Sequence, residues 1–147
     1  MKLSLTHLCT FILTSLIFLI SCNSQKHNKA EIESAMKQYD HLLLKMDADS
    51  ISMLYTTDGI LAGAVGRDSI KKFLLSFPNV RVLSQSSVTN SIEITKDTAI
   101  QKGTYSQTDL ISDNDTISVK GEFTARWHWI REDNGWRLKE MITKPIK

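Results

Sequence analysis

The sequence predicts an α+β domain in which N-terminal helices pack on one face of a curved antiparallel sheet. Two observations support this prediction. Apolar residues recur every three or four positions up to Phe77, as in amphipathic helices, and at alternate positions beyond Val80, as in strands. Turn sequences such as Lys96-Asp97 and Asn134-Gly135 divide the second half into segments of strand length. Helices followed by a meander of strands are typical of an α+β fold.

Residues 1–21 have the pattern of a secretory leader. Lys2 gives a basic start, and the apolar run Leu8–Ile20 is too short to span a membrane. The tripeptide Leu19-Ile20-Ser21 before Cys22 resembles the lipobox of bacterial lipoproteins. This resemblance implies a lipid on Cys22 that anchors the protein to the membrane of the bacterial cell envelope. Asn23, rather than Asp, after this cysteine resembles the outer-membrane sorting signal of enteric bacteria, so we expect the outer membrane, facing the periplasm. The alternative is an unmodified cysteine near a processed terminus.

Residues 22–29 are expected to form a polar tether, and residues 30–147 a single domain. Asn23–Lys29 is polar and has no hydrophobic period, as in a flexible linker. Ala30–Met46 has the period of a helix. Its apolar positions are Ile32, Ala35, Met36, Tyr39, Leu42, Leu43 and Met46.

Shorter elements follow this helix. Asp47 or Asp49 can cap a second helix that carries Ile51, Leu54 and Tyr55, and Asp58-Gly59 predicts a turn after it. Ile60–Val65 is expected to be a short strand with a loop. A third helix starts near Arg67 and ends before Pro78. The four long strands are expected at Val80–Thr95, Thr98–Ile111, Thr116–Arg131 and Trp136–Thr143.

Composition and motifs exclude several classes of function. The formal net charge is +2 and the basic residues are scattered, so no nucleic acid is expected as a partner. Cys9 would leave with the leader and Cys22 would carry the lipid, which leaves no disulfide in the mature domain. No phosphate-binding or dinucleotide-binding motif is present, and the histidines are dispersed. We therefore expect neither a cofactor nor a metal.

The alternation of side chains in the strands predicts which residues face the helices. In Thr116–Arg131 the inner series is Ile117, Val119, Phe123, Ala125, Trp127 and Trp129, and the outer series is Glu122, Thr124, Arg126 and His128. In the last strand the inner series is Trp136, Leu138, Glu140 and Ile142. Glu140 would then enter an apolar interior, where it could serve as an acid or base. A partner that neutralises it, or a register slip that exposes it, is the alternative.

Other polar residues share the parity of apolar strand positions. They are Ser84, Ser86, Asn90 and Gln101. Such residues either line a cavity or mark a bulge that changes the register.

Several short motifs of the chain resemble the nuclear transport factor 2-like superfamily, which includes ketosteroid isomerases, SnoaL-type polyketide cyclases and kinase association domains. The matching residues are Tyr39, Asp47, Tyr55 and Asp58, then Gly66-Arg67-Asp68-Ser69-Ile70, Asp97-Thr98-Ala99, Gly103, Gly121, Trp127 and Asn134-Gly135-Trp136-Arg137-Leu138. The resemblance implies the cone-shaped, cystatin-like α+β fold. It also implies a homodimer formed through the outer sheet face, with Glu122, Thr124, Arg126 and His128 in contact.

The resemblance argues against the isomerase reaction. Tyr39 aligns with the oxyanion donor of ketosteroid isomerases, whereas their general base aligns with Gly63, and Gly59–Gly66 contains no base. The leading hypothesis is a non-catalytic domain that binds a small apolar ligand or mediates dimerisation or another protein interaction. The expected ligand-binding residues are Tyr39, Tyr55, Tyr105, Trp127, Trp129 and Glu140. These aromatic residues could equally fill the core. The alternative function is an isomerase, dehydratase or cyclase that uses Glu140 and Tyr39.

Overall fold

A computed structural model describes residues 27–112 and 115–146. The predicted leader, the lipidation site at Cys22 and residues 22–26 of the predicted tether lie outside the described residues. In the described part, helices α2 (Lys29–Lys45), α3 (Ala48–Met53) and α4 (Arg67–Leu75) precede the long strands. No helix of this part is long and apolar enough to cross a membrane.

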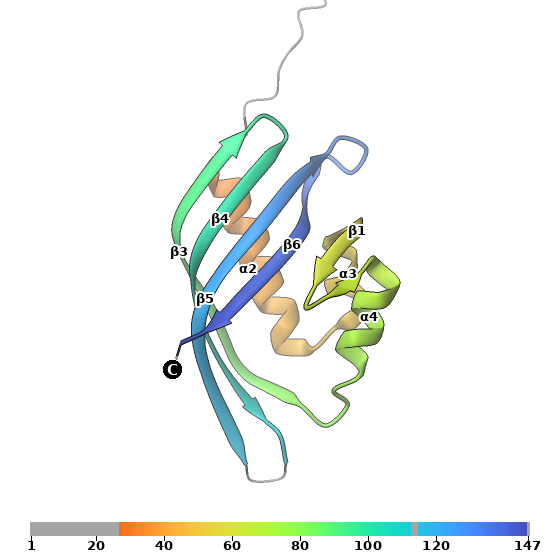
Figure 1. Cartoon of the computed structure of the whole chain (residues 1–147), viewed down its shortest axis with the longest axis vertical. Coiled ribbons are helices and arrows are strands. Elements are labelled where there is room, and N and C mark those ends of the chain that lie inside the picture. Colours follow the sequence, from red (N-terminus) through yellow and green to blue (C-terminus); the bar gives the residue numbers. More distant parts are fainter. Residues whose placement is uncertain (1–26, 113–114, 147) are drawn as a thin grey trace, which may run out of the picture.

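The strands of the described residues form one curved sheet in the order β2-β1-β6-β5-β4-β3. Their bounds are β1 (Tyr55–Leu61), β2 (Ala64–Val65), β3 (Arg81–Thr95), β4 (Thr98–Leu110), β5 (Thr116–Ile130) and β6 (Gly135–Pro145). The long strands β3 to β6 pair antiparallel as a meander, and β1 runs parallel to β6. Helix α2 crosses one face of the sheet, and α3 and α4 lie beside β1 (Figure 1). The predicted α+β class is confirmed.

Helix α2 begins earlier than the sequence predicts. Asn28 is its N-cap, because the Asn28 side chain accepts a hydrogen bond of 3.2 Å from the backbone N–H of Glu31. Residues 27–29, which we expected in the tether, therefore belong to the folded domain. At the other end of α2, Met46 takes a left-handed conformation with φ 47°. Asp47 then caps α3 by accepting a bond of 3.0 Å from the N–H of Ser50.

Strand β1 replaces two predicted elements. Tyr55 opens the strand rather than continuing the second helix, and Asp58-Gly59 lies inside the strand rather than in a turn. The parallel pairing with β6 overrides the local turn preference. Gly59 suits this pairing because an added Cβ atom would lie 2.8 Å from the Cβ atom of Tyr55. The Arg67 side chain also holds the strand, since its Nε donates to the carbonyl oxygen of Tyr55 at 2.8 Å.

The core lies between α2 and the sheet. Its largest fully buried side chains are Trp127, Tyr55, Ile32, Ile51, Ile70, Leu138 and Gln101. Both polar atoms of the buried Gln101 amide have a partner, because its Oε1 accepts from the indole N–H of Trp127 at 3.0 Å and its Nε2 donates to the hydroxyl of Thr89 at 2.8 Å. A buried amide is tolerated when its hydrogen bonds are satisfied.

Three irregularities in the antiparallel pairing of β3 to β6 change which side chains face inward. In β3 the register shifts between Val82 and Ser84 and again between Thr89 and Ser91. In β6 it shifts opposite Arg126 and Trp127, so that Lys139 is the extra residue. Each bulge adds one residue and reverses the parity that follows it. The first shift turns Gln85 and Ser87 inward, and the second restores the original parity of β3.

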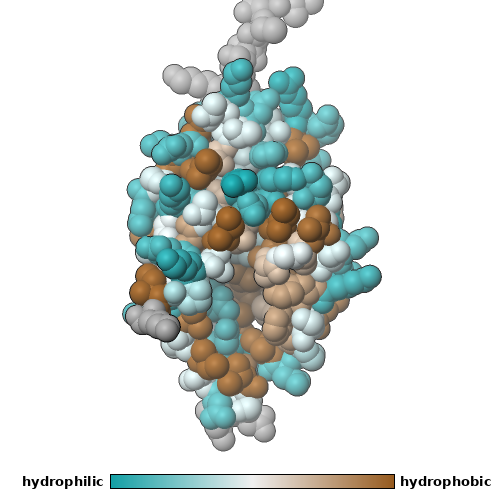
Figure 2. Space-filling view, viewed as in Figure 1, coloured by the Kyte–Doolittle hydropathy of each residue, from teal (hydrophilic) through white to brown (hydrophobic). Residues whose placement is uncertain are grey.

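The outer face of the sheet is mainly hydrophilic. Figure 2 shows it with hydrophobic residues as small separate groups among hydrophilic ones. On β5 the expected outer residues Glu122 and Arg126 are exposed, while Thr124 and His128 are half-buried. Single exposed hydrophobic residues are ordinary on a protein surface.

Candidate functional site

A cavity of about 240 Å³ lies between the inner sheet face and the helices. Helices α2 and α4, strand β1 and the long strands β3 to β6 all contribute to its wall. Its lining residues are Met36, Tyr39, Leu43, Leu61, Phe73, Leu74, Gln85, Ser87, Tyr105, Gln107, Val119, Phe123, Met141 and Thr143. Most of the wall is apolar, as in sites for small organic molecules.

Glycines in the sheet make room for two aromatic residues of the wall. A Cβ atom on Gly121 would lie 2.6 Å from the ring of Tyr105, and one on Gly103 would lie 2.7 Å from the ring of Phe123. Each ring therefore packs against a glycine of the neighbouring strand while it lines the cavity. Because these two glycines lack side chains, the space enclosed by the wall stays open.

The polar part of the wall is on β3 and β4. Gln85 faces Gln107 across the two strands, and Ser87 faces Tyr105. Residues directly opposite on one face of a sheet have Cβ atoms about 5 Å apart, so these side chains form one continuous patch. The patch is turned inward because the first bulge of β3 reverses the strand parity.

Two aspartates outside the lining hold this patch. Asp40 on α2 accepts hydrogen bonds from Gln85 Nε2 at 2.9 Å, from the backbone N–H of Ser87 at 2.9 Å and from the hydroxyl of Ser87 at 2.8 Å. Asp109 on β4 accepts two bonds from Gln107 Nε2, at 2.9 and 2.8 Å. Hydrogen bonds to ionised carboxylates are stronger than neutral ones, so the side chains of the patch are fixed in orientation.

Tyrosine hydroxyls supply the polar groups on the helix side. Tyr39 lines the cavity, and the hydroxyl of Tyr55 donates to that of Tyr39 from deeper in the core at 3.5 Å. Burial raises the pKa of Tyr39 above its usual value of 10.0 and raises the pKa of Tyr55 well above it. Both phenols are therefore neutral at physiological pH and serve as hydrogen-bonding groups rather than as bases.

The structure brings only part of the predicted ligand-binding set together. Tyr39 and Tyr105 line the cavity. Tyr55 and Trp127 are buried in the core beside it, and Trp127 is held there by Gln101. Trp129 packs instead against His27 and Trp136, toward the other end of the strands. Strand parity gave the inward direction of both tryptophans correctly, but not their distance from the cavity.

The predicted inward orientation of Glu140 is wrong. Because Lys139 forms a bulge, Glu140 pairs with Arg126 on β5, and its carboxylate lies 3.4 Å from the Arg126 guanidinium. Arg126 is exposed, so this ion pair lies on the outer face of the sheet. Met141 takes the inner position in place of Glu140, and Ile142 is exposed rather than inward. Sequence analysis left open a register slip that exposes Glu140, and the structure shows this slip.

The cavity wall contains no carboxylate, imidazole, thiol, ammonium or guanidinium group among the described residues. Gly63, at the position where ketosteroid isomerases have their base, lies in the turn between β1 and β2 with φ 85°. No cluster of three or more potential metal ligands occurs in residues 27–112 and 115–146. The wall can thus offer apolar contacts, amide groups and hydroxyl groups to a ligand.

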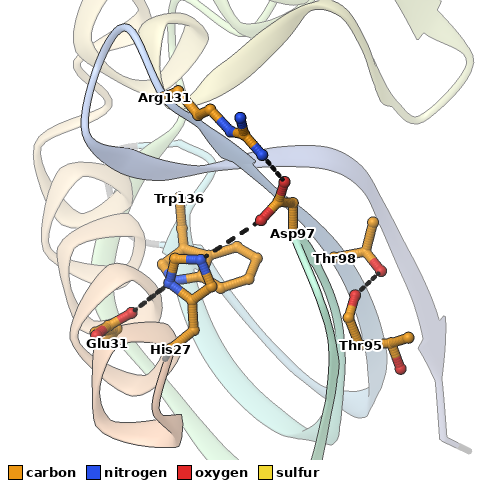
Figure 3. Close-up of polar contacts among 7 residues, drawn as sticks. All are labelled: His27, Glu31, Thr95, Asp97, Thr98, Arg131 and Trp136. Atoms are coloured by element: carbon orange, nitrogen blue, oxygen red, sulfur yellow. Dashed lines mark hydrogen bonds and ion pairs between the residues drawn. The ribbon is translucent and has the colours of Figure 1, made fainter. Parts of the chain in front are cut away.

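A second polar cluster fastens the start of α2 to the sheet (Figure 3). The ring of His27 lies between Trp129 and Trp136, with ring centres 4.3 and 4.8 Å away. Its Nδ1 lies 3.3 Å from a Glu31 oxygen and its Nε2 lies 3.7 Å from an Asp97 oxygen. Sequence analysis missed this contact because His27 falls in a short polar run without a period.

Comparisons with known proteins agree with this architecture. The model of the SnoaL-like domain family matches residues 25–142. A ketosteroid isomerase-like protein from Erwinia carotovora atroseptica superposes with a TM-score of 0.71 at 19% identity, covering 82% of this chain and 99% of that one. Among curated proteins, none matches the sequence at a significant level.

Other similar structures carry different functional names. One, from Xanthomonas campestris, is provisionally described as a calcium/calmodulin-dependent protein kinase II association domain. It has a TM-score of 0.65 at 18% identity and covers 82% of this chain and 89% of its own. Another, from Novosphingobium aromaticivorans, is provisionally described as an aromatic ring hydroxylase. It has a TM-score of 0.67 at 16% identity and covers 80% of this chain and 88% of its own.

Similarity at this level of identity establishes the fold, because one fold hosts many activities. The neighbours show that the chain has the nuclear transport factor 2-like fold. The family match extends over most of the sequence, including every helix described above and all long strands except the end of β6. The chain belongs to the SnoaL-like domain family.

Proposed function

We propose that this SnoaL-like domain binds a small, mostly apolar molecule without transforming it. The supporting observation is the cavity of about 240 Å³, whose wall combines apolar side chains with one ordered polar patch. Pockets that bind small molecules commonly have this composition. The absence of a base from the described wall supports binding rather than proton transfer, because a general base must reach the proton that it removes.

The enzymatic alternative depends on Glu140 and Tyr39 acting on one substrate. Tyr39 lines the cavity, whereas Glu140 pairs with Arg126 on the opposite face of the sheet. A single small molecule therefore does not contact both groups. This separation favours the binding function over an isomerase, dehydratase or cyclase that would use the pair.

Calorimetric titration of the full-length protein with naphthalene tests the proposed binding. We expect saturable binding of one molecule per chain. Val119→Trp should abolish it, because Val119 is part of the cavity wall. Ile117→Trp is the matched control: it lies on the same strand at the same parity, is 47% exposed and is outside the wall. Equal binding by wild type and Val119→Trp would contradict the assignment of the cavity as the site.

We also propose that a lipid on Cys22 anchors the protein to the bacterial envelope, in the outer membrane facing the periplasm. The support is the leader pattern and the tripeptide that precedes Cys22. Mass spectrometry of the protein from its host should show acyl chains, palmitate among them, on Cys22. Separation of inner and outer membranes should place the wild type in the outer membrane, while Cys22→Ser should leave the membranes on washing without detergent. Retention of Cys22→Ser would refute this anchor.

A homodimer through the outer sheet face is proposed on the resemblance to the superfamily and on the solvent-facing row Glu122, Thr124, Arg126 and His128. Sedimentation at micromolar concentration should give the mass of two chains. His128→Glu should shift it toward one chain, because it places an added negative charge on each copy at the contact. A wild-type monomer at this concentration would contradict the proposal.

A further inference from the structure

We propose that the cavity selects a neutral, mostly apolar molecule that carries a hydrogen-bond donor, such as a hydroxyl or an N–H group. This inference rests on the proposed binding function and specifies its ligand. It is carried by Gln85, Ser87 and Gln107, the polar residues of the wall on β3 and β4. Each of them directs a side-chain N–H or O–H group to an aspartate that is not part of the wall.

The orientation of the two amides follows from the chemistry of their partners. An ionised carboxylate only accepts hydrogen bonds, so Asp40 and Asp109 both require the NH₂ end of the glutamine that they contact. The amide group is planar, so a bond from its nitrogen to the aspartate fixes the direction of its oxygen as well. With the nitrogens of Gln85 and Gln107 held by the aspartates, the oxygens have a fixed direction, and the buried oxygen of Gln85 is the one without a partner within the described residues.

Ser87 also offers a hydrogen-bond acceptor to a ligand. Its hydroxyl hydrogen is used in the bond of 2.8 Å to Asp40, so the hydroxyl oxygen retains only its acceptor function. Gln85 and Gln107 are direct cross-strand neighbours, and Ser87 is the next inward residue after Gln85. The three acceptors therefore belong to one patch and can act on a single donor group.

One of these acceptors lacks a partner. Gln85 Oε1 is buried and makes no hydrogen bond within residues 27–112 and 115–146. A buried acceptor without a partner is costly, and a ligand that donates to it removes that cost. The remaining polar groups of the wall are the hydroxyls of Tyr39, Tyr105 and Thr143, which can donate or accept. These three hydroxyl groups do not counteract the preference for a ligand with a hydrogen-bond donor that the acceptors of the patch create.

Two ligands of similar shape test the inference. 2-Naphthol has a hydroxyl donor, and 2-fluoronaphthalene has no O–H or N–H group. In calorimetric titrations of the full-length protein, we expect 2-naphthol to bind roughly fivefold or more tightly, the factor for one net hydrogen bond. The double variant Gln85→Leu/Gln107→Leu should reduce the ratio of the two affinities to about one while still binding 2-fluoronaphthalene.

The variant Asp40→Asn tests whether the orientation of the Gln85 amide, rather than the shape of the cavity, causes the preference for 2-naphthol. Asparagine can donate as well as accept, so the Gln85 amide can turn, and the preference for 2-naphthol should fall severalfold without loss of cavity volume. Thr108→Leu, on the outer face of β4 next to Gln107, is the control and should keep the wild-type ratio.

The outcomes for the two proposals are distinguishable. Equal affinities of the wild type for the two ligands, or an unchanged preference in the double glutamine variant, would overturn the donor selectivity and leave the cavity function intact. Failure of both ligands and of naphthalene to bind saturably would contradict the cavity function and this inference with it.

Discussion

The hydroxyl groups of Tyr39 and Tyr55 meet 3.5 Å apart between α2 and β1, with ring centres 6.4 Å apart and ring planes at 68°. This contact joins the helix to the sheet edge directly beneath the cavity. Tyr39 thus has one side toward the core and one toward the cavity, and its neutral form is favoured by burial. The arrangement links the stability of the fold to the protonation of two phenols.

We expect the protein to lose stability in alkaline solution through this pair. The pKa of Tyr55 is raised well above 10.0 in the folded state by burial and by the neighbouring Tyr39. The folded state therefore holds its proton more tightly than the unfolded chain. This stabilisation is complete below pH 10 and is lost as the pH rises toward the folded-state pKa. Urea unfolding between pH 8 and 11 measures it, with pH values chosen around the usual tyrosine pKa of about 10.

Tyr55→Phe should flatten the dependence of the unfolding free energy on pH above this point. Tyr105→Phe, which removes a hydroxyl from the cavity wall instead, is the control. An identical alkaline slope in wild type and Tyr55→Phe would show that the pair does not cause the loss.

Gln101→Leu should destabilise the fold by about 1 to 3 kcal/mol, because it removes the partner of a buried indole N–H. Gln101 is fully buried and joins Trp127 to Thr89. Chemical denaturation gives the free energy of unfolding. In a double-mutant cycle, Gln101→Leu should cost less in a Trp127→Phe background, since that background lacks the N–H. Strict additivity of the two changes would contradict a coupling through this hydrogen bond.

Gly121→Ala should both destabilise the sheet and narrow the cavity. An added methyl group would lie 2.5 Å from the carbonyl oxygen of Lys144 and 2.6 Å from the ring of Tyr105, so the ring must move into the cavity. Overpacking of this kind costs about 1 to 3 kcal/mol. We expect a lower melting temperature and weaker naphthalene binding.

Gly135→Ala provides the comparison for that experiment. Its Cβ atom would meet only the end of the flexible Arg137 side chain, at 3.3 Å, and an Asp133 carbonyl at 3.6 Å. Naphthalene affinity should be unchanged in this variant. If both alanine variants bind as the wild type does, Gly121 does not set the space available to a ligand.

Glu140→Gln should change neither the affinity for naphthalene nor that for 2-naphthol. Its carboxylate pairs with Arg126, whose side chain is 57% exposed, and surface pairs of this kind contribute about 0 to 1 kcal/mol. Calorimetric titration and urea unfolding measure the two quantities. A tenfold loss of affinity would contradict the outer-face position and return Glu140 to the list of ligand contacts.

Most helices and strands could be predicted, because the spacing of apolar residues along a single sequence differs between helices and strands. The inner series on β5, from Val119 to Trp129, follows strict alternation and is buried or half-buried as expected. The helix from Ala30 was predicted to within one residue of its observed start at Lys29. Only the end of strand β1, at Ile60 and Leu61, was predicted as strand, because the turn preference of Asp58-Gly59 is local and the pairing of β1 with β6 is not.

The candidate site was harder to predict, because bulges in the strands decide which side chains face the cavity. Alternation from Val82 places Ser84 and Ser86 inward, whereas the structure places Gln85 and Ser87 there. A single extra residue causes this difference, and its position depends on the partner strand. In β6 one signal was available: Met141 is an apolar neighbour of Glu140 and competes with it for the inner position.

The two bulges of β3 cancel one another, so Val82 and Ile92 on either side both point to the interior. The segment between them can therefore be reversed independently of the flanking strand. A slip of this segment by one residue, which moves the extra residue of the first bulge to the second, would exchange the exposed and enclosed sides of this segment alone. The position of the bulges is therefore an evolutionary route to new ligand preferences on an unchanged scaffold.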